Sequence, residues 1–283
     1  MRVSTISVRI CVIAVVSLLT CRTALSSLIW SGNPASGASV FKLLNLEDAN
    51  KVEQPNPSAN GSSITVIPDP TYGQDFQFYK AAADLRAEAH GAKNFNPAIG
   101  STYYLGWRFE VNSTVNDNAV FQWKAYGTTG STLQQNFPLV LSFRSNQLQL
   151  HYFSTGEVDH LLWSEPEVAN TWNSIVLCIH VEPDNTGFVN YWWDGAEQNL
   201  GDGGTTYNCS TFDPGGTSVD PKWGIYGAVG TQVTNDVNSL AIGTTYADVA
   251  PAPEPSSLAL LGSCMTALPA ISVLRARRRR GPA

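Results

Sequence analysis

Short runs of alternating apolar and polar residues recur along the central part of the chain, and helical periodicity is scarce there. Successive side chains of a strand point to opposite faces, so this alternation is typical of half-buried β-strands. Turn-forming residues separate the runs, as at Asn116-Asp117-Asn118, Ser145-Asn146 and Asp194-Gly195. The clearest runs predict strands at residues 103–111, 119–125, 139–143, 147–153, 174–181, 188–193 and 222–226.

Many short, regularly spaced strands with polar turns between them are typical of a β-sandwich or a jelly roll. We therefore predict an all-β fold, a sandwich of two antiparallel sheets, formed by one domain that spans residues 28–250. The sequence of this region shows neither an internal repeat nor a linker. A stretch rich in Gly, Asn and Ser at about residues 200–218 predicts a long loop.

The two ends of the chain differ from the middle and predict export. A short apolar run at residues 10–21 follows an arginine-bearing start, which is the layout of a secretory signal peptide, here residues 1–27. Residues 251–283 contain Pro-Glu-Pro, a mostly apolar stretch and an arginine cluster, in that order. This order resembles the PEP-CTERM sorting signal of Gram-negative bacteria; the alternative is a plain membrane anchor. The resemblance implies transient residence of this segment in the membrane, processing by a sorting protease, and delivery to the cell envelope or extracellular matrix.

Charged residues are unevenly distributed along the chain, so the net charge of the whole chain does not describe the predicted domain. The formal net charge is −6, but eight of the 17 lysines and arginines lie in the two terminal segments. Residues 28–250 contain nine lysines and arginines against 22 acidic residues, a net charge of −13. This excess of negative charge argues against nucleic-acid binding through the phosphates. It also makes the domain a poor general attractor for any polyanion, so a polyanionic ligand would need a local cluster of cations.

Two of the five cysteines, Cys178 and Cys209, lie inside the predicted domain. In an oxidising compartment they can form one disulfide, and the alternative is that they are buried thiols. No Cys/His spacing indicates zinc.

Three predicted strands each carry polar side chains on one face and small or apolar side chains on the other. Residues two apart in a strand share a face, which brings such groups together. Each strand alone is compatible with an ordinary solvated sheet face, but three of them indicate a site. The polar faces consist of Arg86, Glu88 and His90 in the first strand, Gln122 and Lys124 in the second, and Lys222, Gly224 and Tyr226 in the third.

These strands resemble the motifs of jelly-roll polysaccharide lyases, the group of the alginate, heparin and glucuronan lyases. Those families have an early Arg-x-Glu, a central Gln-x-His and a late Lys-x-Gly-x-Tyr. The early and late motifs are matched by Arg86-Ala-Glu88 and Lys222-Trp-Gly224-Ile-Tyr226, whereas Gln122-Trp-Lys124 has lysine in place of histidine. Residues 172–195 also resemble a concanavalin-like strand pair, and the resemblance covers about residues 70–245. The run Phe-Gln-Trp-Lys-Ala-Tyr is most similar to glucuronan lyase, polysaccharide lyase family 20.

The resemblance implies a concanavalin-like jelly roll that cleaves an acidic, uronic-acid-containing polysaccharide by β-elimination, as a monomer and without a required cofactor. In that reaction a base removes the C5 proton, which is acidified when the adjacent carboxylate is neutralised, and the oxygen at C4 leaves. Gln122 would donate a hydrogen bond to the carboxylate, and Arg86, Lys124 or Lys222 would supply positive charge. Tyr226 is the candidate acid and also a candidate base.

The general base is left open, because the central histidine of the family is absent. His90 shares the face of Arg86 and is the candidate to replace it, since imidazole titrates near neutral pH. Glu88 is expected to orient Arg86 by an ion pair at the substrate site. The candidate platforms for sugar rings are Tyr126, Tyr191 and Trp192. Oxygen ligands for a structural calcium could come from Asp202, Asp213, Asp220 and Asp248, although no EF-hand spacing supports them.

Two other functions compete with the lyase interpretation. A glycoside hydrolase needs two suitably spaced carboxylates. Glu157 and Asp159 come nearest, but Leu161 and Leu162 stand where a further glutamate is required. A non-catalytic carbohydrate-binding or matrix protein on the same fold remains open. The positions of three cations distinguish the lyase from the carbohydrate-binding protein. A lyase requires Arg86, Lys124 and Lys222 to lie on the same face, whereas their location on different faces favours the non-catalytic carbohydrate-binding protein.

Overall fold

The computed structural model of the protein describes residues 27–166 and 168–251. The predicted signal peptide and sorting segment lie outside the described residues, apart from one residue at the edge of each. Nearly all of the described regular structure is β-strand; the exceptions are η1 (Pro34–Ser36), η2 (Ala38–Val40) and α1 (Tyr246–Val249). In this part of the chain, no helix has the length and apolar character needed to cross a membrane.

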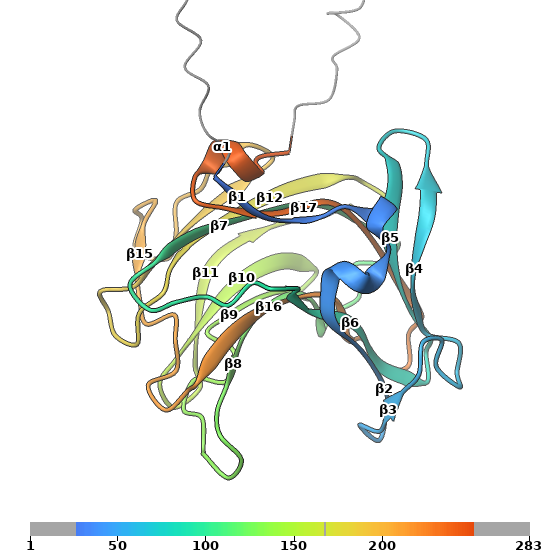
Figure 1. The fold of residues 1–283 in the computed structure, drawn as a ribbon, viewed down its shortest axis with the longest axis horizontal. Helices are drawn as coiled ribbons and strands as arrows, with labels where there is room; N and C mark the ends of the chain where they lie inside the picture. The colour runs from blue at the N-terminus through green and yellow to red at the C-terminus, as the bar shows by residue number, and fades with distance from the viewer. Residues whose placement is uncertain (1–26, 167, 252–283) are drawn as a thin grey trace, which may run out of the picture.

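Two antiparallel sheets packed face to face confirm the predicted jelly-roll sandwich (Figure 1). The outer sheet has nine strands among the described residues, in the order β14-β13-β12-β7-β17-β5-β4, with β1 beside β17 and β15 beside β13. Its strands are β1 (Leu28–Gly32), β4 (Ser63–Asp69), β5 (Gly73–Lys80), β7 (Thr102–Val111), β12 (Asn173–His180), β13 (Phe188–Trp193), β14 (Ala196–Glu197), β15 (Tyr207–Asn208) and β17 (Val233–Gly243).

The inner sheet has eight described strands, in the order β11-β10-β9-β8-β16-β6-β2-β3. In Figure 1 it bends into an arch whose hollow side faces away from the outer sheet. Its strands are β2 (Phe41–Asp48), β3 (Glu53–Gln54), β6 (Asp84–Ala92), β8 (Asn118–Tyr126), β9 (Leu139–Arg144), β10 (Gln147–Ser154), β11 (Val158–Glu165) and β16 (Ser218–Gly227).

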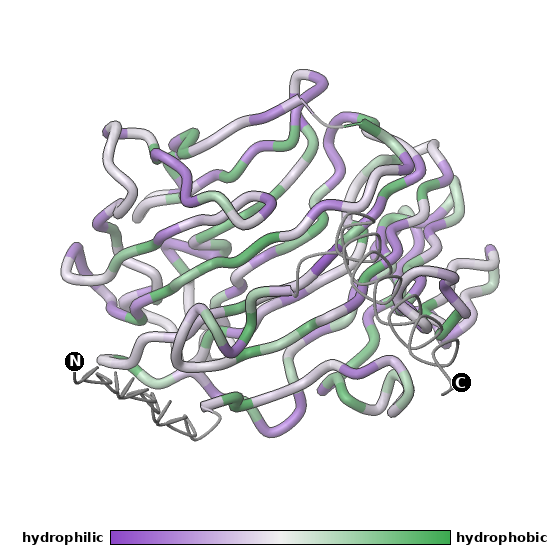
Figure 2. The backbone as a smooth tube through the Cα atoms, turned by 90° about the horizontal axis from the view of Figure 1, so that it is seen from above, coloured by the Kyte–Doolittle hydropathy of each residue, from purple (hydrophilic) through white to green (hydrophobic). Residues whose placement is uncertain are grey.

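Large aromatic side chains fill the space between the sheets. Trp107, Trp123 and Trp223 are at most 1% exposed, and Trp30 of β1 stacks on Trp223 with 5.6 Å between ring centroids. Figure 2 shows the alternation of hydrophobic and hydrophilic positions along the strands that produces this core. Because Trp223 points into the sandwich, the residues on either side of it point into the hollow of the inner sheet. The packing of the core therefore determines which side chains of the inner sheet point into its hollow.

The two ends of the described chain lie together on the outer sheet. Strand β1 pairs with β17, and α1 follows β17 directly. The Ser27 hydroxyl donates a hydrogen bond to Asp248, which also caps α1 through Thr245. The first and last described residues are thus held on the sheet that does not form the hollow.

Every predicted strand is present, but the sequence pattern did not identify several others, among them β17 and β5. In β17 the alternation is hidden because two of its buried residues are polar. Asn235 donates a hydrogen bond to the Gly224 carbonyl at 2.8 Å, and Asn238 donates one to Asp75 at 2.8 Å. Both asparagines are at most 2% exposed. Satisfied polar groups can occupy a buried position at little cost, and they then conceal the strand from pattern analysis.

Cys178 and Cys209 are both buried and are both free thiols. The structure therefore has the two buried thiols and not the disulfide. Cys178 lies in β12, where burial raises the pKa of its thiol to about 11. Such thiols are protonated at neutral pH and therefore poor nucleophiles.

Acidic side chains crowd one region of the outer sheet. Asp75 of β5 is 1% exposed, and burial raises its pKa to about 6, although Asn238 donates a hydrogen bond to it. The negative charges of Asp69, Asp236 and Glu110 raise it further. Asp236 and Glu110 are direct cross-strand partners, and burial raises the pKa of each. This region therefore opposes folding when it is fully ionised.

Replacing Asp75 by asparagine is expected to raise the free energy of unfolding at pH 7 by about 1–3 kcal/mol. The folded protein holds a proton on Asp75 between its ordinary pKa of 3.8 and about 6, where the unfolded chain has lost it. This group therefore adds stability as the pH falls from about 6 towards 4, and Asp75→Asn removes that dependence. Urea unfolding on both sides of this pH range measures the effect. An identical pH dependence in the variant would show that Asp75 is not the responsible group.

Candidate active site

The three strands that carry the predicted polar faces are neighbours in the middle of the inner sheet, in the order β8-β16-β6. Lys222 of β16 lies opposite Gln122 on one side and opposite His90 on the other. Tyr226, four residues further along β16, lies opposite Arg86. The registers therefore place one row of predicted side chains at His90, Lys222 and Gln122 and a second row at Arg86 and Tyr226. Glu88 lies between the rows, opposite Gly224, and Lys124 lies beyond the first row, opposite Asp220.

Gly224, the glycine of the late motif, lies in a β-bulge between these rows. Its φ is +137°, and an added Cβ would come within 2.3 Å of the Ala87 carbonyl oxygen, so a side chain cannot be accommodated. From Trp223 to Tyr226, β16 advances by three residues while β8 advances by two. A bulge of this kind re-aims the side chains that follow it. The glycine thus sets the direction of Tyr226 relative to β8.

A buried carboxylate links the two cations of β6 and β16. Glu88 is 2% exposed, and its Oε2 lies 3.0 Å from Lys222 Nζ and 3.2 Å from Arg86 Nη1. Arg86 is also paired with Glu47, at 3.0 Å between Nε and Oε2, and donates to Asn45 at 2.8 Å. The predicted ion pair between Glu88 and Arg86 is therefore present. Glu88 and Glu47 together balance the charges of Arg86 and Lys222.

Lys124 differs from Arg86 and Lys222 because its charge is not balanced by a paired carboxylate in the described part of the chain. Its ammonium group donates to the Ala125 carbonyl at 2.6 Å and to the Asn136 side chain, and it lies 4.8 Å from the ring centroids of Tyr126 and Phe137. Among the described residues it forms no ion pair with a carboxylate. Burial, followed by the nearby charge of Lys222 and the smaller effect of Arg86, lowers the pKa of Lys124 to about 8.

Arg86, Lys124 and Lys222 therefore converge on one face of the inner sheet. Arg86 and Lys222 share Glu88, and their charges both act on Lys124. This is the arrangement that the lyase interpretation requires and that a scattered set of surface cations would have contradicted.

His90 lies at the end of this cluster that is distant from Tyr226. Its ring stacks on Tyr126 at 4.9 Å, and its Nε2 is 3.7 Å from Asp220, which accepts from Lys42 at 2.7 Å. Four residues of β16 separate the partner of His90 from Tyr226, which corresponds to roughly 13 Å along the strand. His90 and Tyr226 are therefore too far apart to act as base and acid on the same sugar residue.

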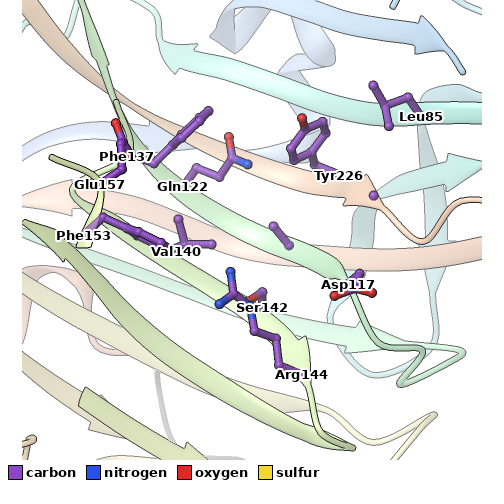
Figure 3. Close-up of a pocket in the computed structure, with 12 residues that line it drawn as sticks. Leu85, Asp117, Gln122, Phe137, Val140, Ser142, Arg144, Phe153, Glu157 and Tyr226 are labelled. Carbon is purple, nitrogen blue, oxygen red and sulfur yellow. The ribbon is translucent and has the colours of Figure 1, made fainter. Parts of the chain in front are cut away.

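A depression of about 300 Å³ opens between Gln122 and Tyr226 and continues across β9 and β10 (Figure 3). Gln122 is 3% exposed, and its Oε1 has no hydrogen-bond partner among the described residues. Because buried amides are normally satisfied, this group is available to a polar ligand. The depression is lined by Leu85, Asp117, Ala119, Gln122, Phe137, Val140, Ser142, Arg144, Phe153, Glu157, Tyr226 and Gly227.

Two of the predicted sugar-binding aromatics are not in this site. Tyr191 and Trp192 belong to β13, which lies in the outer sheet. Tyr191 is fully buried and packs on Trp163 at 4.7 Å, whereas Trp192 contacts Tyr104 and Tyr246. The prediction that Tyr191 and Trp192 contact substrate beside Tyr226 is therefore wrong. Strand periodicity gives the face of a residue but not the sheet to which the strand belongs.

The four aspartates considered for calcium have separate protein partners. Asp213 accepts backbone hydrogen bonds from residues 134 and 135, Asp220 pairs with Lys42, Asp248 caps α1, and Asp202 accepts from the backbone of residue 204. In the described ranges, no group of three or more His, Cys, Asp or Glu side chains is arranged to hold a metal ion. The four aspartates considered for a structural calcium therefore do not come together in the described part of the chain.

The sequence interpretation missed the part of the depression that lies on β9 to β11. Ser142 and Arg144 line it, and His151 and Asp159 lie next to Arg144 outside the lining. Asp159 is engaged by Arg144 at 2.6 Å and by His151 at 2.6 Å. These residues form no recognisable motif, and the alternation in β9 and β10 was the one signal that placed them on a common face.

Comparison with known proteins gives a family and a fold. The family model described as "Polysaccharide lyase" matches residues 35–240. Among solved structures, an endo-β-1,4-glucuronan lyase from the fungus Trichoderma reesei is 16% identical, with a TM-score of 0.53, over 74% of this chain and 98% of that one. The alginate lyase A1-II′, a member of polysaccharide lyase family 7, is 14% identical, with a TM-score of 0.46, over 71% and 93% of the two chains. The curated proteins contain no match.

Proposed function

Because this chain belongs to the polysaccharide lyase family, we propose that it cleaves a uronic-acid polysaccharide, specifically a glucuronan-like chain, by β-elimination in the hollow of the inner sheet. The observation that carries the proposal is that Gln122 and Tyr226 line one depression on the hollow face, with the Arg86 guanidinium 4.4 Å from the centroid of the Tyr226 ring. Lys124 lies on the same face, further along the strands from Tyr226. Lys124 is a partly buried cation with no carboxylate partner among the described residues, which suits an anionic sugar.

The first requirement of the reaction is to neutralise the carboxylate next to C5. Arg86 lies beside Tyr226 and supplies positive charge at this position. Lys124, opposite Asp220 and six residues of β16 from Tyr226, is available to the carboxylate of a neighbouring sugar. The amide of Gln122 can donate a hydrogen bond to the carboxylate next to C5. Such preorganised donors become most valuable when charge develops on the carboxylate oxygens as the C5 proton leaves, and each typically contributes about 2.7–4 kcal/mol to the barrier.

Proton transfer is assigned to Tyr226. As the phenolate it takes the C5 proton, the C4–O bond breaks as the double bond forms between C4 and C5, and the same proton passes to the departing oxygen at C4. The guanidinium of Arg86 lies 4.4 Å from the centroid of the Tyr226 ring, so a positive charge faces the residue that carries the proton. The distance of His90 from Tyr226 along β16 favours one residue in both roles. His90 is then assigned to substrate binding beside Tyr126.

The elimination leaves a conjugated double bond that absorbs ultraviolet light, which gives a direct test. The purified domain is incubated with glucuronan, alginate and heparin, and the absorbance of the product is followed with time. The proposal expects an increase with at least one uronan and the largest increase with glucuronan. Binding to these polymers with no unsaturated product would instead support the non-catalytic carbohydrate-binding protein.

The activity is expected to fall on the alkaline side of pH 8. Lys124, with its pKa lowered to about 8 by burial and by Lys222, is charged below that pH and neutral above it. The pH profile of kcat/KM reports groups of the free enzyme, so above this value kcat/KM of the wild-type protein should decrease by about tenfold per pH unit relative to that of Lys124→Gln. The variant should be less active below pH 8 and lack this step. The same pH dependence in both proteins would show that the charge of Lys124 does not act on the substrate.

The remaining expectations concern the context of the enzyme. The apolar run with its arginines at residues 1–27 supports export, and the Pro-Glu-Pro segment with its arginine cluster supports envelope or matrix sorting. We extend the proposal to a domain that works outside the cytoplasm as a monomer on an acidic polysaccharide. Fractionation of cells that express the full chain, followed by gel filtration of the recovered protein, tests both parts.

A further inference from the structure

A buried hydroxyl without a protein partner lies in the depression, beyond the groups assigned to the chemistry. Ser142 of β9 is 3% exposed, and its Oγ has no hydrogen-bond partner among the described residues. Val140, two residues away on the same strand, is the partner of Gln122, so roughly 7 Å along the strand separates the positions of Ser142 and Gln122. Two unsatisfied buried polar side chains that line one depression indicate a ligand that presents several polar groups.

Arg144, two residues beyond Ser142, is the only lysine or arginine among the described residues that line this depression. In Figure 3 its side chain extends past Ser142 towards the middle of the hollow. One of its donors contacts Asp159 at 2.6 Å, and its guanidinium lies 5.7 Å from the centroid of the Phe153 ring. A guanidinium has five donors in a planar fork, so an engagement through one nitrogen leaves donors for a carboxylate.

Arg144 is held in place by a chain of hydrogen bonds on the floor of the cleft. Asp159, its partner, is 2.6 Å from His151 Nδ1, and His151 Nε2 is 2.9 Å from Gln149 Oε1. His151 is 5% exposed, so the inner end of this chain is buried, whereas the side chains of Arg144 and Asp159 are 36% and 38% exposed. A cation whose orientation is fixed in advance loses less side-chain entropy when it binds.

From these contacts we infer that Ser142 and Arg144 form a second uronate-binding position, next to the one at which elimination occurs. Ser142 bonds a ring hydroxyl and Arg144 bonds the carboxylate of a neighbouring sugar, while Phe153 packs against the ring. The position binds substrate without taking part in proton transfer, and it makes the enzyme prefer chains long enough to reach it. The inference rests on the proposed function.

The test is the dependence of cleavage on chain length in Arg144→Gln, with glucuronan oligosaccharides of increasing length. For chains that reach the second position, kcat/KM should fall by about tenfold through a higher KM with kcat retained. The shortest chain that is still cleaved should be unaffected. Ser142→Ala should shift KM in the same direction by a smaller factor, and Arg144→Lys should retain part of the preference. Lys51→Gln, which removes the same charge from an exposed turn, serves as the matched control.

Binding measured by calorimetry separates failure of this inference from failure of the proposed function. The longest oligosaccharide is titrated into inactive Tyr226→Phe protein with and without Arg144→Gln. Weaker binding with Arg144→Gln supports the second position even if the wild-type protein cleaves no uronan. Equal binding, or an equal loss of kcat/KM at every chain length, overturns it while lyase activity stands. A protein that neither cleaves nor binds any uronan overturns both.

Discussion

Tyr226→Phe is expected to reduce kcat by about a thousandfold or more while leaving the protein folded. The substitution removes one oxygen atom, the group to which we assign both the removal of the C5 proton and the protonation of the oxygen at C4. Within the described residues the Tyr226 hydroxyl forms no hydrogen bond, so its loss leaves no buried group unsatisfied. The rate of formation of unsaturated product measures the effect, and thermal unfolding shows that the fold is retained.

A matched control separates loss of the phenol from a general effect of removing a hydroxyl. Tyr79 is also half-buried in a strand, but it lies in β5 of the outer sheet, so Tyr79→Phe should leave kcat unchanged. Substantial activity of Tyr226→Phe would refute the assignment and transfer the search for the base to Lys124 and His90. The pH profile then decides between these two.

Glu88→Gln is expected to lower the free energy of unfolding by about 3–5 kcal/mol, the largest effect on stability in the site. Lys222 is 3% exposed, and Glu88, at 3.0 Å, is its carboxylate partner. Glutamine has nearly the same shape but no charge, so the variant leaves a buried ammonium group uncompensated. The charge of Arg86 stays balanced in the variant, because Arg86 keeps its ion pair with Glu47. Urea unfolding at neutral pH measures the difference.

The origin of this effect is tested by removing the cation as well. In the double variant Glu88→Gln with Lys222→Met, no buried charge remains unpaired, and we expect most of the lost stability to return. Glu165→Gln, which removes the same charge from an exposed position at the end of β11, should change the free energy of unfolding by less than about 0.5 kcal/mol. A double variant as unstable as Glu88→Gln alone would mean that packing, rather than charge, makes Glu88 necessary.

Much of this architecture could be predicted from the sequence because most strands alternate cleanly. The predicted runs at residues 139–143 and 147–153 differ from β9 and β10 by one residue at one end. The three polar faces are adjacent because β8, β16 and β6 are neighbours in the inner sheet. The Lys-x-Gly-x-Tyr spacing predicted both the row of side chains and the glycine at the bulge, since Gly224 has a backbone conformation that other residues rarely adopt.

Long-range pairing is what the sequence could not supply. The assignment of β13 to the outer sheet removed Trp192 from the site, and no local pattern encodes which sheet a strand joins. The register between β16 and β6 separates His90 from Tyr226, although both lie on the hollow face. The pairing of Glu88 with Lys222 joins residues 134 positions apart and leaves Lys124 as the cation without a carboxylate partner. Each of these results depends on contacts between strands rather than on composition.

The position of the two ends has a consequence for how the domain works when it is tethered. Ser27 and Asp248 meet on the outer sheet, and the hollow of the inner sheet opens on the opposite side of the sandwich (Figure 1). A support, a membrane or a neighbouring module attached through either end therefore lies behind the molecule, and the cleft faces outward. A long polymer can then enter the cleft sideways without passing the attachment point, so immobilisation through the ends should preserve access for macromolecular substrates.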